Sequence, residues 1–266
     1  MFIIEVPYFN LAQIYDSMQA PRWMRLKDNK FVVIHKDKAI TVEQKRQRLI
    51  FNCSEEEFYN TWFYYFDLKT DYFDLNMKAR NLGKKFKVVA NRGNGIHILN
   101  QDPFELYIYC RLATFVGFRK ASELMNRIAV TYGTRHKNSM GDAGRVFWYE
   151  WPNPEELLEK LNHEKESSGK VKPLLKEICN AILYSDFDVT KSSNELFGLF
   201  CLRENIFPLV DVEETLRKNF DCDPNDFADW YLGDFEDCGL VYTYILHHIM
   251  NPPKKIKEVL SNGVSR

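Results

Sequence analysis

The hydrophobic pattern of this chain changes from strand-like to helix-like along its length. Residues 31–35, 39–42 and 48–51 are short runs of β-branched and aromatic residues separated by polar turns. Such runs predict a small antiparallel sheet within the first fifty residues. Longer helical patterns dominate the remainder. The order predicts an α+β fold, with a small N-terminal antiparallel β domain followed by a mostly α-helical body.

Two helix starts are marked by their capping residues. Ser54 and Glu57 form a capping box, which predicts a helix over 55–66. Pro103 stands at the first position of a helix predicted over 104–114. Further helical patterns occur at 118–132, 154–162, 171–183, 192–202, 212–219 and 240–250.

Composition excludes several classes of protein. With 45% hydrophobic and 15% aromatic residues, the chain can form a packed core, which argues against intrinsic disorder. No apolar stretch approaches the roughly 18 residues that span a bilayer. The N-terminus lacks a basic region followed by a long apolar core. We therefore expect a protein without membrane association, located in the cytoplasm or with the nucleoid or nucleus.

The cysteine and histidine spacing predicts neither a metal site nor a cofactor. The six cysteines are scattered and include no C-x2-C pair, so buried reduced thiols are the better interpretation. His247 and His248 are adjacent, so they point to different faces of a helix and do not suit one metal ion.

The net charge is close to zero, but the charges are unevenly distributed. Residues 22–48 contain nine Lys/Arg and three Asp/Glu. Residues 76–97 contain six Lys/Arg and no Asp/Glu, and residues 111–145 contain seven and two. Residues 204–239, by contrast, carry eleven acids and two bases. If the fold gathers the basic segments on one face, a polyanion can lie along them. The alternative is a set of ordinary solvated surfaces.

Lys191 and Asp211 are the candidate catalytic pair. Lys191 lies just inside an amphipathic run, and Asp211 stands twenty positions later in the apolar sequence Phe-Pro-Leu-Val-Asp-Val. A lysine with an aspartate in apolar surroundings suggests amine chemistry. The alternative is a surface lysine and an aspartate that caps a helix.

Three blocks of this chain resemble the 8-oxoguanine DNA glycosylase branch of the helix-hairpin-helix glycosylases. They are residues 58–72, residues 207–212 and, most specifically, the Gly-Ile-x-x-Leu-x-Gln-Asp-Pro-Phe-Glu run at 95–105. The resemblance covers roughly residues 1–250. It implies a β-rich domain over 1–98, a helical glycosylase domain over 99–250 with a hairpin near 181–202, and a C-terminal tail over 251–266.

The resemblance also implies roles for individual residues. Lys191 falls on the Schiff-base nucleophile, which must lose its proton before it can attack. Asp211 falls on the carboxylate that stabilises the oxocarbenium ion formed at a flipped nucleotide. Val189 and Thr190 precede the nucleophile on the hairpin, and Arg111 opens a basic segment. All three are expected to contact DNA.

Several positions depart from the family pattern. The hairpin usually presents glycines to a phosphate, whereas residues 186–188 are Asp-Phe-Asp, which should weaken DNA binding. The turn that fills the space left by the extruded base is apolar at 112–117. In the base pocket, Met18 replaces a glycine whose carbonyl reads the N7 hydrogen of 8-oxoguanine. Leu240 and Tyr244 replace a glutamine and a phenylalanine, although both also fit an apolar helix face.

The sequence therefore predicts a DNA glycosylase that excises a modified or damaged base by base flipping and lysine imine chemistry, and that also acts as an AP lyase. The expected partner is double-stranded DNA with a modified base or an abasic site, and the expected state is a monomer. One alternative is a catalytically inactive protein of the same fold that binds altered or structured DNA. Another is an N-glycosylase that acts on a different nucleic acid, including foreign modified DNA.

Overall fold

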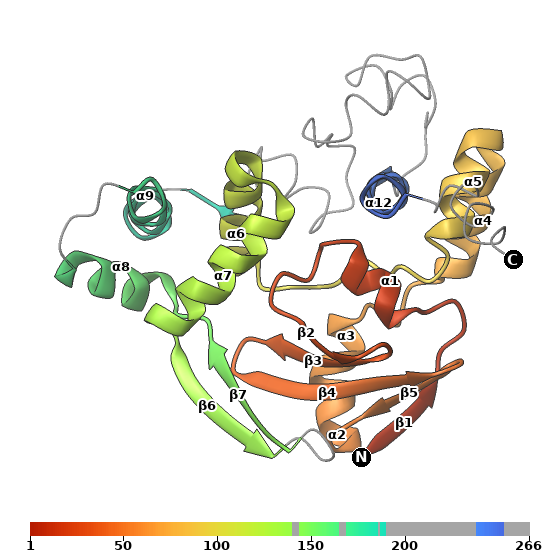
Figure 1. Ribbon diagram of the computed structural model, residues 1–266, viewed down its shortest axis with the longest axis horizontal. Coiled ribbons are helices and arrows are strands. Elements are labelled where there is room, and N and C mark those ends of the chain that lie inside the picture. Colours follow the sequence, from red (N-terminus) through yellow and green to blue (C-terminus); the bar gives the residue numbers. More distant parts are fainter. Residues whose placement is uncertain (140–143, 165–168, 186, 190–237, 253–266) are drawn as a thin grey trace, which may run out of the picture.

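The computed structural model describes residues 1–139, 144–164, 169–185, 187–189 and 238–252. A five-stranded sheet lies beside a body of helices, and a two-stranded hairpin runs along one side of the sheet (Figure 1). The predicted α+β class, with the antiparallel sheet at the N-terminus, is confirmed.

The sheet has the strand order β1-β5-β4-β3-β2, and all neighbouring strands are antiparallel. The strands span Phe2–Glu5 (β1), Met24–Lys27 (β2), Lys30–His35 (β3), Lys38–Lys45 (β4) and Arg48–Phe51 (β5). The sequence predicts β3, β4 and β5. It does not predict β1 and β2, because each has four residues and lies at a sheet edge, where the alternating pattern is weak.

A helix with a π-helical turn packs beneath the sheet. It consists of α2 (Glu55–Glu57), η1 (Phe58–Trp62) and α3 (Phe63–Tyr65), and it corresponds to the helix predicted over 55–66. The Ser54 hydroxyl accepts a hydrogen bond from the Glu57 N–H at 3.1 Å, as the capping box predicts.

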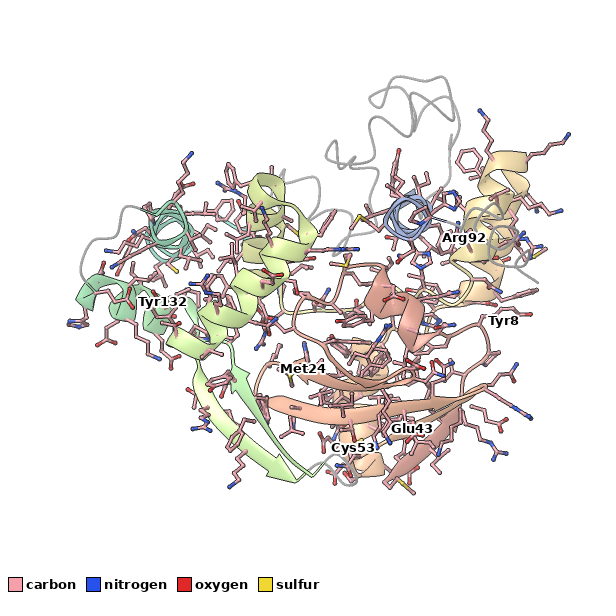
Figure 2. The ribbon with its side chains drawn as sticks, viewed as in Figure 1. Tyr8, Met24, Glu43, Cys53, Arg92 and Tyr132 are labelled. Atoms are coloured by element: carbon pink, nitrogen blue, oxygen red, sulfur yellow. The ribbon has the colours of Figure 1, made fainter. Side chains whose placement is uncertain are left out.

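Strand β3 is buried on both faces. Phe31 and Val33 point into the core that the sheet shares with η1 and with α1 (Leu11–Asp16). Val32 and Ile34 point the other way and contact Trp148. Met24, labelled in Figure 2, joins that second cluster. Two-sided burial explains why β3 is a continuous apolar run.

The helical body confirms most of the predicted helices. It contains α4 (Tyr72–Asn81), α5 (Lys84–Arg92), α6 (Pro103–Val116), α7 (Phe118–Tyr132), α8 (Pro154–His163), α9 (Val171–Tyr184) and α12 (Cys238–Met250). The helices predicted over 104–114, 118–132, 154–162, 171–183 and 240–250 are α6, α7, α8, α9 and α12. Those predicted over 192–202 and 212–219 lie outside the described residues.

The sequence does not predict α4, α5 or the hairpin of β6 (Thr134–Ser139) and β7 (Arg145–Glu150). β6 contains no apolar residue, so the alternation that marks a strand is absent there. The hairpin is selected by a tertiary contact, because Trp148 of β7 packs on β3 and is 2% exposed. In α5, Phe86 and Val89 form a buried stripe between lysines.

Arg22 connects three parts of the fold. Its guanidinium is 3% exposed and pairs through two nitrogens with the Glu105 carboxylate in the first turn of α6, with 2.8 Å between Nη2 and Oε2. Nη1 donates to the carbonyl oxygen of Tyr149 at 2.6 Å, and the group lies 5.5 Å from the ring centroid of Trp151. One side chain thus joins the segment before β2 to α6 and β7.

The described ranges offer neither a membrane span nor a metal site. No helix within them is long and apolar enough to cross a bilayer. Within the same ranges, no group of three or more His, Cys, Asp or Glu residues is placed to hold a metal ion. Cys53, Cys110 and Cys179, the cysteines whose side chains are described, are buried and form no disulfide.

We predict that Glu105→Gln lowers the free energy of unfolding by about 3–5 kcal/mol, because the buried Arg22 guanidinium loses its counter-charge. Denaturant titration measures the loss. Arg48→Gln is the matched control, since it breaks an ion pair with Glu5 whose side chains are 67% and 64% exposed. That change should cost less than about 1 kcal/mol. Equal losses in the two variants would contradict the role given to Arg22.

Candidate functional site

Two segments that are far apart in sequence are joined by Gln19. Its Nε2 donates to the His97 carbonyl oxygen at 2.9 Å, and its Oε1 accepts from the Leu99 N–H at 2.8 Å. Its own carbonyl oxygen accepts from Gln101 Nε2 at 2.7 Å. Because Gln19 is fully buried, these bonds hold the loop at 17–19 firmly against the Gly95–Glu105 run that leads into α6.

Met18 lies in this loop with a left-handed backbone, at a φ of +64°. That conformation favours glycine, and the resemblance places a family glycine at this position. The Met18 carbonyl oxygen accepts a hydrogen bond from the Tyr109 hydroxyl at 2.6 Å. The carbonyl that is expected to read a base is therefore already bonded to a side chain of α6.

Tyr109 is a permanent donor in this bond. Its side chain is fully buried, and burial raises the pKa of the hydroxyl well above its ordinary value. The hydroxyl therefore stays protonated at any physiological pH. The sequence pattern marks this residue only by its place in α6, one turn after the Gln-Asp-Pro-Phe-Glu motif.

Leu240 and Tyr244 lie on α12, inside the helical core. Leu240 is 0% and Tyr244 1% exposed. The Tyr244 ring lies against Gly93, where an added Cβ would come within 2.2 Å of the ring, and its hydroxyl accepts from Asn76 Nδ2 at 3.2 Å. Burial raises the Tyr244 pKa to about 12 despite the Asn76 bond. This placement favours the interpretation of both residues as an apolar helix face over the base-pocket interpretation.

The start of the hairpin follows α9 and packs on α6. Phe187 contacts the Tyr107 ring, with centroids 5.5 Å apart, and Val189 packs against the helical core. Asp188 is exposed. A carboxylate at the surface of this turn is consistent with the predicted weakening of phosphate binding.

The Arg111 side chain of α6 reaches toward α9 and shares the partner Tyr107 with Phe187 of this turn. Its guanidinium donates to the Tyr107 hydroxyl at 3.0 Å and to Glu177 Oε1 at 3.4 Å. Arg111, which is predicted to contact DNA, therefore already has a carboxylate partner in Glu177. The predicted catalytic residues Lys191 and Asp211, and the DNA-contacting Thr190, lie outside the described residues.

The end of α6 presents an exposed apolar side chain. Phe115 is 68% and Val116 39% exposed, and Gly117 ends the helix at a φ of +77°. The two side chains form a small apolar site at the end of the helix. They fall in the 112–117 turn that is expected to fill the space of an extruded base.

Comparison with known proteins agrees with this arrangement. Residues 1–107 match the family described as 8-oxoguanine DNA glycosylase, N-terminal domain. The resemblance inferred from the sequence is confirmed for this region, and α6 begins within it. A search of curated proteins finds no significant match.

Solved structures extend the likeness of the fold over the whole chain. The 8-oxoguanine glycosylase/lyase of Clostridium acetobutylicum, in complex with double-stranded DNA, is 20% identical with a TM-score of 0.77, over 98% of this chain and 99% of that one. MBOgg1, in complex with a low-affinity DNA ligand, is 18% identical with a TM-score of 0.77, over 93% and 94%. The 3-methyladenine DNA glycosylase of Archaeoglobus fulgidus is 14% identical with a TM-score of 0.70, over 94% and 98%.

Proposed function

We propose that this protein is a DNA glycosylase that releases a modified base from duplex DNA. The observation that carries the proposal is the glycosylase fold, which spans nearly the whole chain and includes a matched N-terminal domain. The similar proteins excise different bases, since one set is named for 8-oxoguanine and another for 3-methyladenine. The fold therefore supports the reaction class rather than one substrate.

The chemistry would be carried by Lys191 and Asp211. As the bond from C1′ to the base breaks, its electron pair leaves with the base, which takes up a proton. Asp211 stabilises the positive charge that develops on the sugar. The Lys191 nitrogen then bonds to C1′, and loss of its proton with opening of the sugar ring gives an imine. β-Elimination from this imine would cleave the strand.

The substrate is proposed to be a base other than 8-oxoguanine. The Met18 carbonyl, whose family role is to accept the N7 hydrogen of that base, is engaged by the Tyr109 hydroxyl. Leu240, where the resemblance places a glutamine that binds the base edge, is instead a fully buried apolar residue of the helical core and offers no amide to a base. A site that lacks such hydrogen bonds discriminates weakly in favour of the base that needs them.

The second candidate function is a catalytically inactive protein that binds altered DNA. The exposed Asp188, at a turn without glycine, favours this alternative because it opposes a close phosphate contact. The presence of Lys191 and Asp211 favours the enzyme. The two candidates differ in one measurable property, since only the enzyme releases a base.

We predict that borohydride traps the protein covalently on duplex DNA with an abasic site, and that Lys191→Gln abolishes the trap. The amide cannot form an imine, whereas an amine can. Lys176→Gln, which changes a lysine of α9, is the control and should trap like the unchanged protein. The adduct is measured by denaturing gel electrophoresis. A trap that survives Lys191→Gln would assign the nucleophile to another residue.

We also predict that Tyr109→Phe increases the rate of 8-oxoguanine excision about tenfold relative to the rate of abasic-site trapping. The change removes the donor and leaves the Met18 carbonyl free to accept the N7 hydrogen, a gain of roughly 1–1.5 kcal/mol. Tyr107→Phe removes a hydroxyl from the same helix that bonds to Arg111 instead, so it serves as the control. Efficient excision of 8-oxoguanine by the unchanged protein would refute the role given to Tyr109.

A further inference from the structure

The α4–α5 helical hairpin carries a concentration of positive charge, and its carboxylates, Asp71 and Asp74, are confined to the start of α4. Residues 75–101 contain six Lys/Arg and no Asp or Glu. Two of the six have roles within the fold. Lys78 pairs with Asp74 at 2.8 Å, and Arg92 donates to His248 Nδ1 at 3.0 Å and to the Asn251 carbonyl oxygen. The other four, Arg80, Lys84, Lys85 and Lys87, are called here the α4–α5 basic surface.

Lys84 and Lys87 do not serve the packing of the hairpin. The buried side of α4 and α5 consists of apolar residues, chiefly Leu75, Ala79, Phe86 and Val89. The helices are held by that side, and α5 packs on α12. Lys84, Lys85 and Lys87 are exposed, and neither Lys84 nor Lys87 forms an ion pair with any other described residue. Like charges placed so close repel one another unless an anion lies over them.

The position of the surface relates it to the candidate site. Figure 1 shows the turn between α4 and α5 on the same side of the molecule as the turn between α6 and α7, where Phe115 is exposed. The basic β6–β7 hairpin lies at the other end and beside the sheet, so the basic segments of the sequence do not form one continuous groove. Arg119 and Lys120, exposed in the first turn of α7, also lie beside Phe115, so the α4–α5 segment adds a second group of cations on this side.

The acidic sequence at 186–188, in place of the expected glycines, suggests why cations are needed elsewhere on the molecule. An exposed Asp188 stands where the fold usually brings backbone N–H groups to a phosphate. Duplex affinity rests largely on neutralised phosphates, so a chain that loses contacts at one point needs them elsewhere. The α4–α5 basic surface provides cations on the side of the molecule where the duplex would meet Phe115.

We propose that the α4–α5 basic surface binds the phosphate backbone of one duplex arm next to the flipped nucleotide. The contact is electrostatic and independent of base sequence. It supplies affinity that the acidic hairpin turn does not. The inference rests on the proposed function for its geometry, but it concerns binding and can be tested apart from catalysis.

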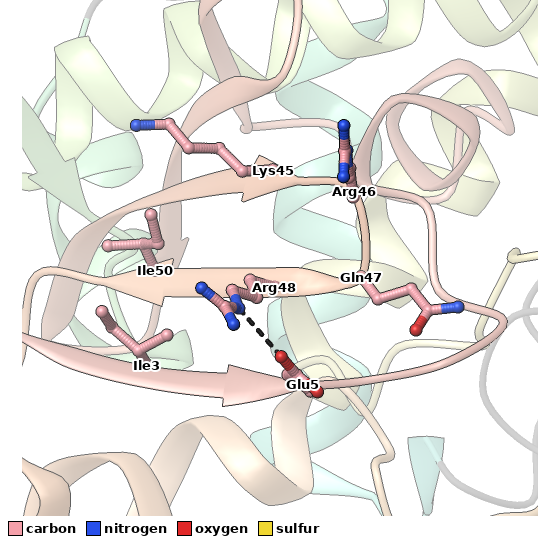
Figure 3. Close-up of a pocket in the computed structure, with 7 residues that line it drawn as sticks. All are labelled: Ile3, Glu5, Lys45, Arg46, Gln47, Arg48 and Ile50. Carbon is pink, nitrogen blue, oxygen red and sulfur yellow. Dashed lines mark hydrogen bonds and ion pairs between the residues drawn. The ribbon is translucent and has the colours of Figure 1, made fainter.

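The test compares two variants that lose the same charge. The first is Lys84→Gln, Lys85→Gln and Lys87→Gln together. The matched control is Lys45→Gln, Arg46→Gln and Arg48→Gln, three cations that line a groove of about 670 Å³ on the outer face of the sheet (Figure 3). A third protein, with arginine in place of Lys84, Lys85 and Lys87, restores the charge. Affinity for a duplex with an abasic-site analogue is measured between roughly 50 and 200 mM salt.

The first variant should bind on the order of tenfold or more weakly, and the slope of log affinity against log salt should become shallower by about 2–3. The control and the arginine variant should keep both values. Equal loss in the first variant and the control would reduce the effect to overall charge and overturn the proposal, as would no loss in either. Thermal unfolding checks that the variants remain folded.

The outcome is separable from that of the proposed function. With saturating abasic DNA, the first variant should still give a borohydride trap, because Lys191 is unchanged. DNA binding through α4–α5 without any trap or base release would contradict the enzymatic function but support the α4–α5 contact. Normal trapping with DNA affinity that does not depend on α4–α5 would support the enzymatic function but contradict the α4–α5 contact.

Discussion

The buried guanidinium of Arg22 is the constraint on which the remaining structure depends. A desolvated charge is tolerated only when its donors are satisfied, and here Glu105, the Tyr149 carbonyl and the Trp151 ring satisfy them together. Because these partners belong to α6, β7 and the following turn, the N-terminal sheet cannot move far relative to the helices. The ion pair acts together with the Gln19 hydrogen bonds and the Tyr109–Met18 bond to hold the β domain against the helical body.

The same rigid connection sets the chemistry of the candidate pocket. Met18 is four residues before Arg22, and Tyr109 is four residues after Glu105, one helical turn further along α6. The ion pair therefore fixes the register in which the Tyr109 hydroxyl meets the Met18 carbonyl. Under the proposed function, this register gives the carbonyl a donor before any base arrives and so disfavours a base that needs the same carbonyl.

The sequence predicts elements whose signals are local and misses those that depend on distant partners. Ser54 and Pro103 mark helix starts by chemistry within one turn, and both predictions hold. The polar strand β6 has no such signal, since Trp148 of its partner strand makes the contact that selects it. In the pocket, Met18 is a candidate because of the motif around it, and its role stays a prediction. Tyr109 has no such signal, because a hydrogen bond across 91 residues leaves no local pattern.

Base release, scored separately from strand cleavage, tests the central claim most directly. The protein is incubated in excess over duplexes that are identical except for the central base, which is varied over oxidised, alkylated and other modified bases. The account predicts release of at least one modified base, with 8-oxoguanine released at least about tenfold more slowly. Tight binding of these duplexes without release of any base would contradict it and would identify the protein as a binder of altered DNA.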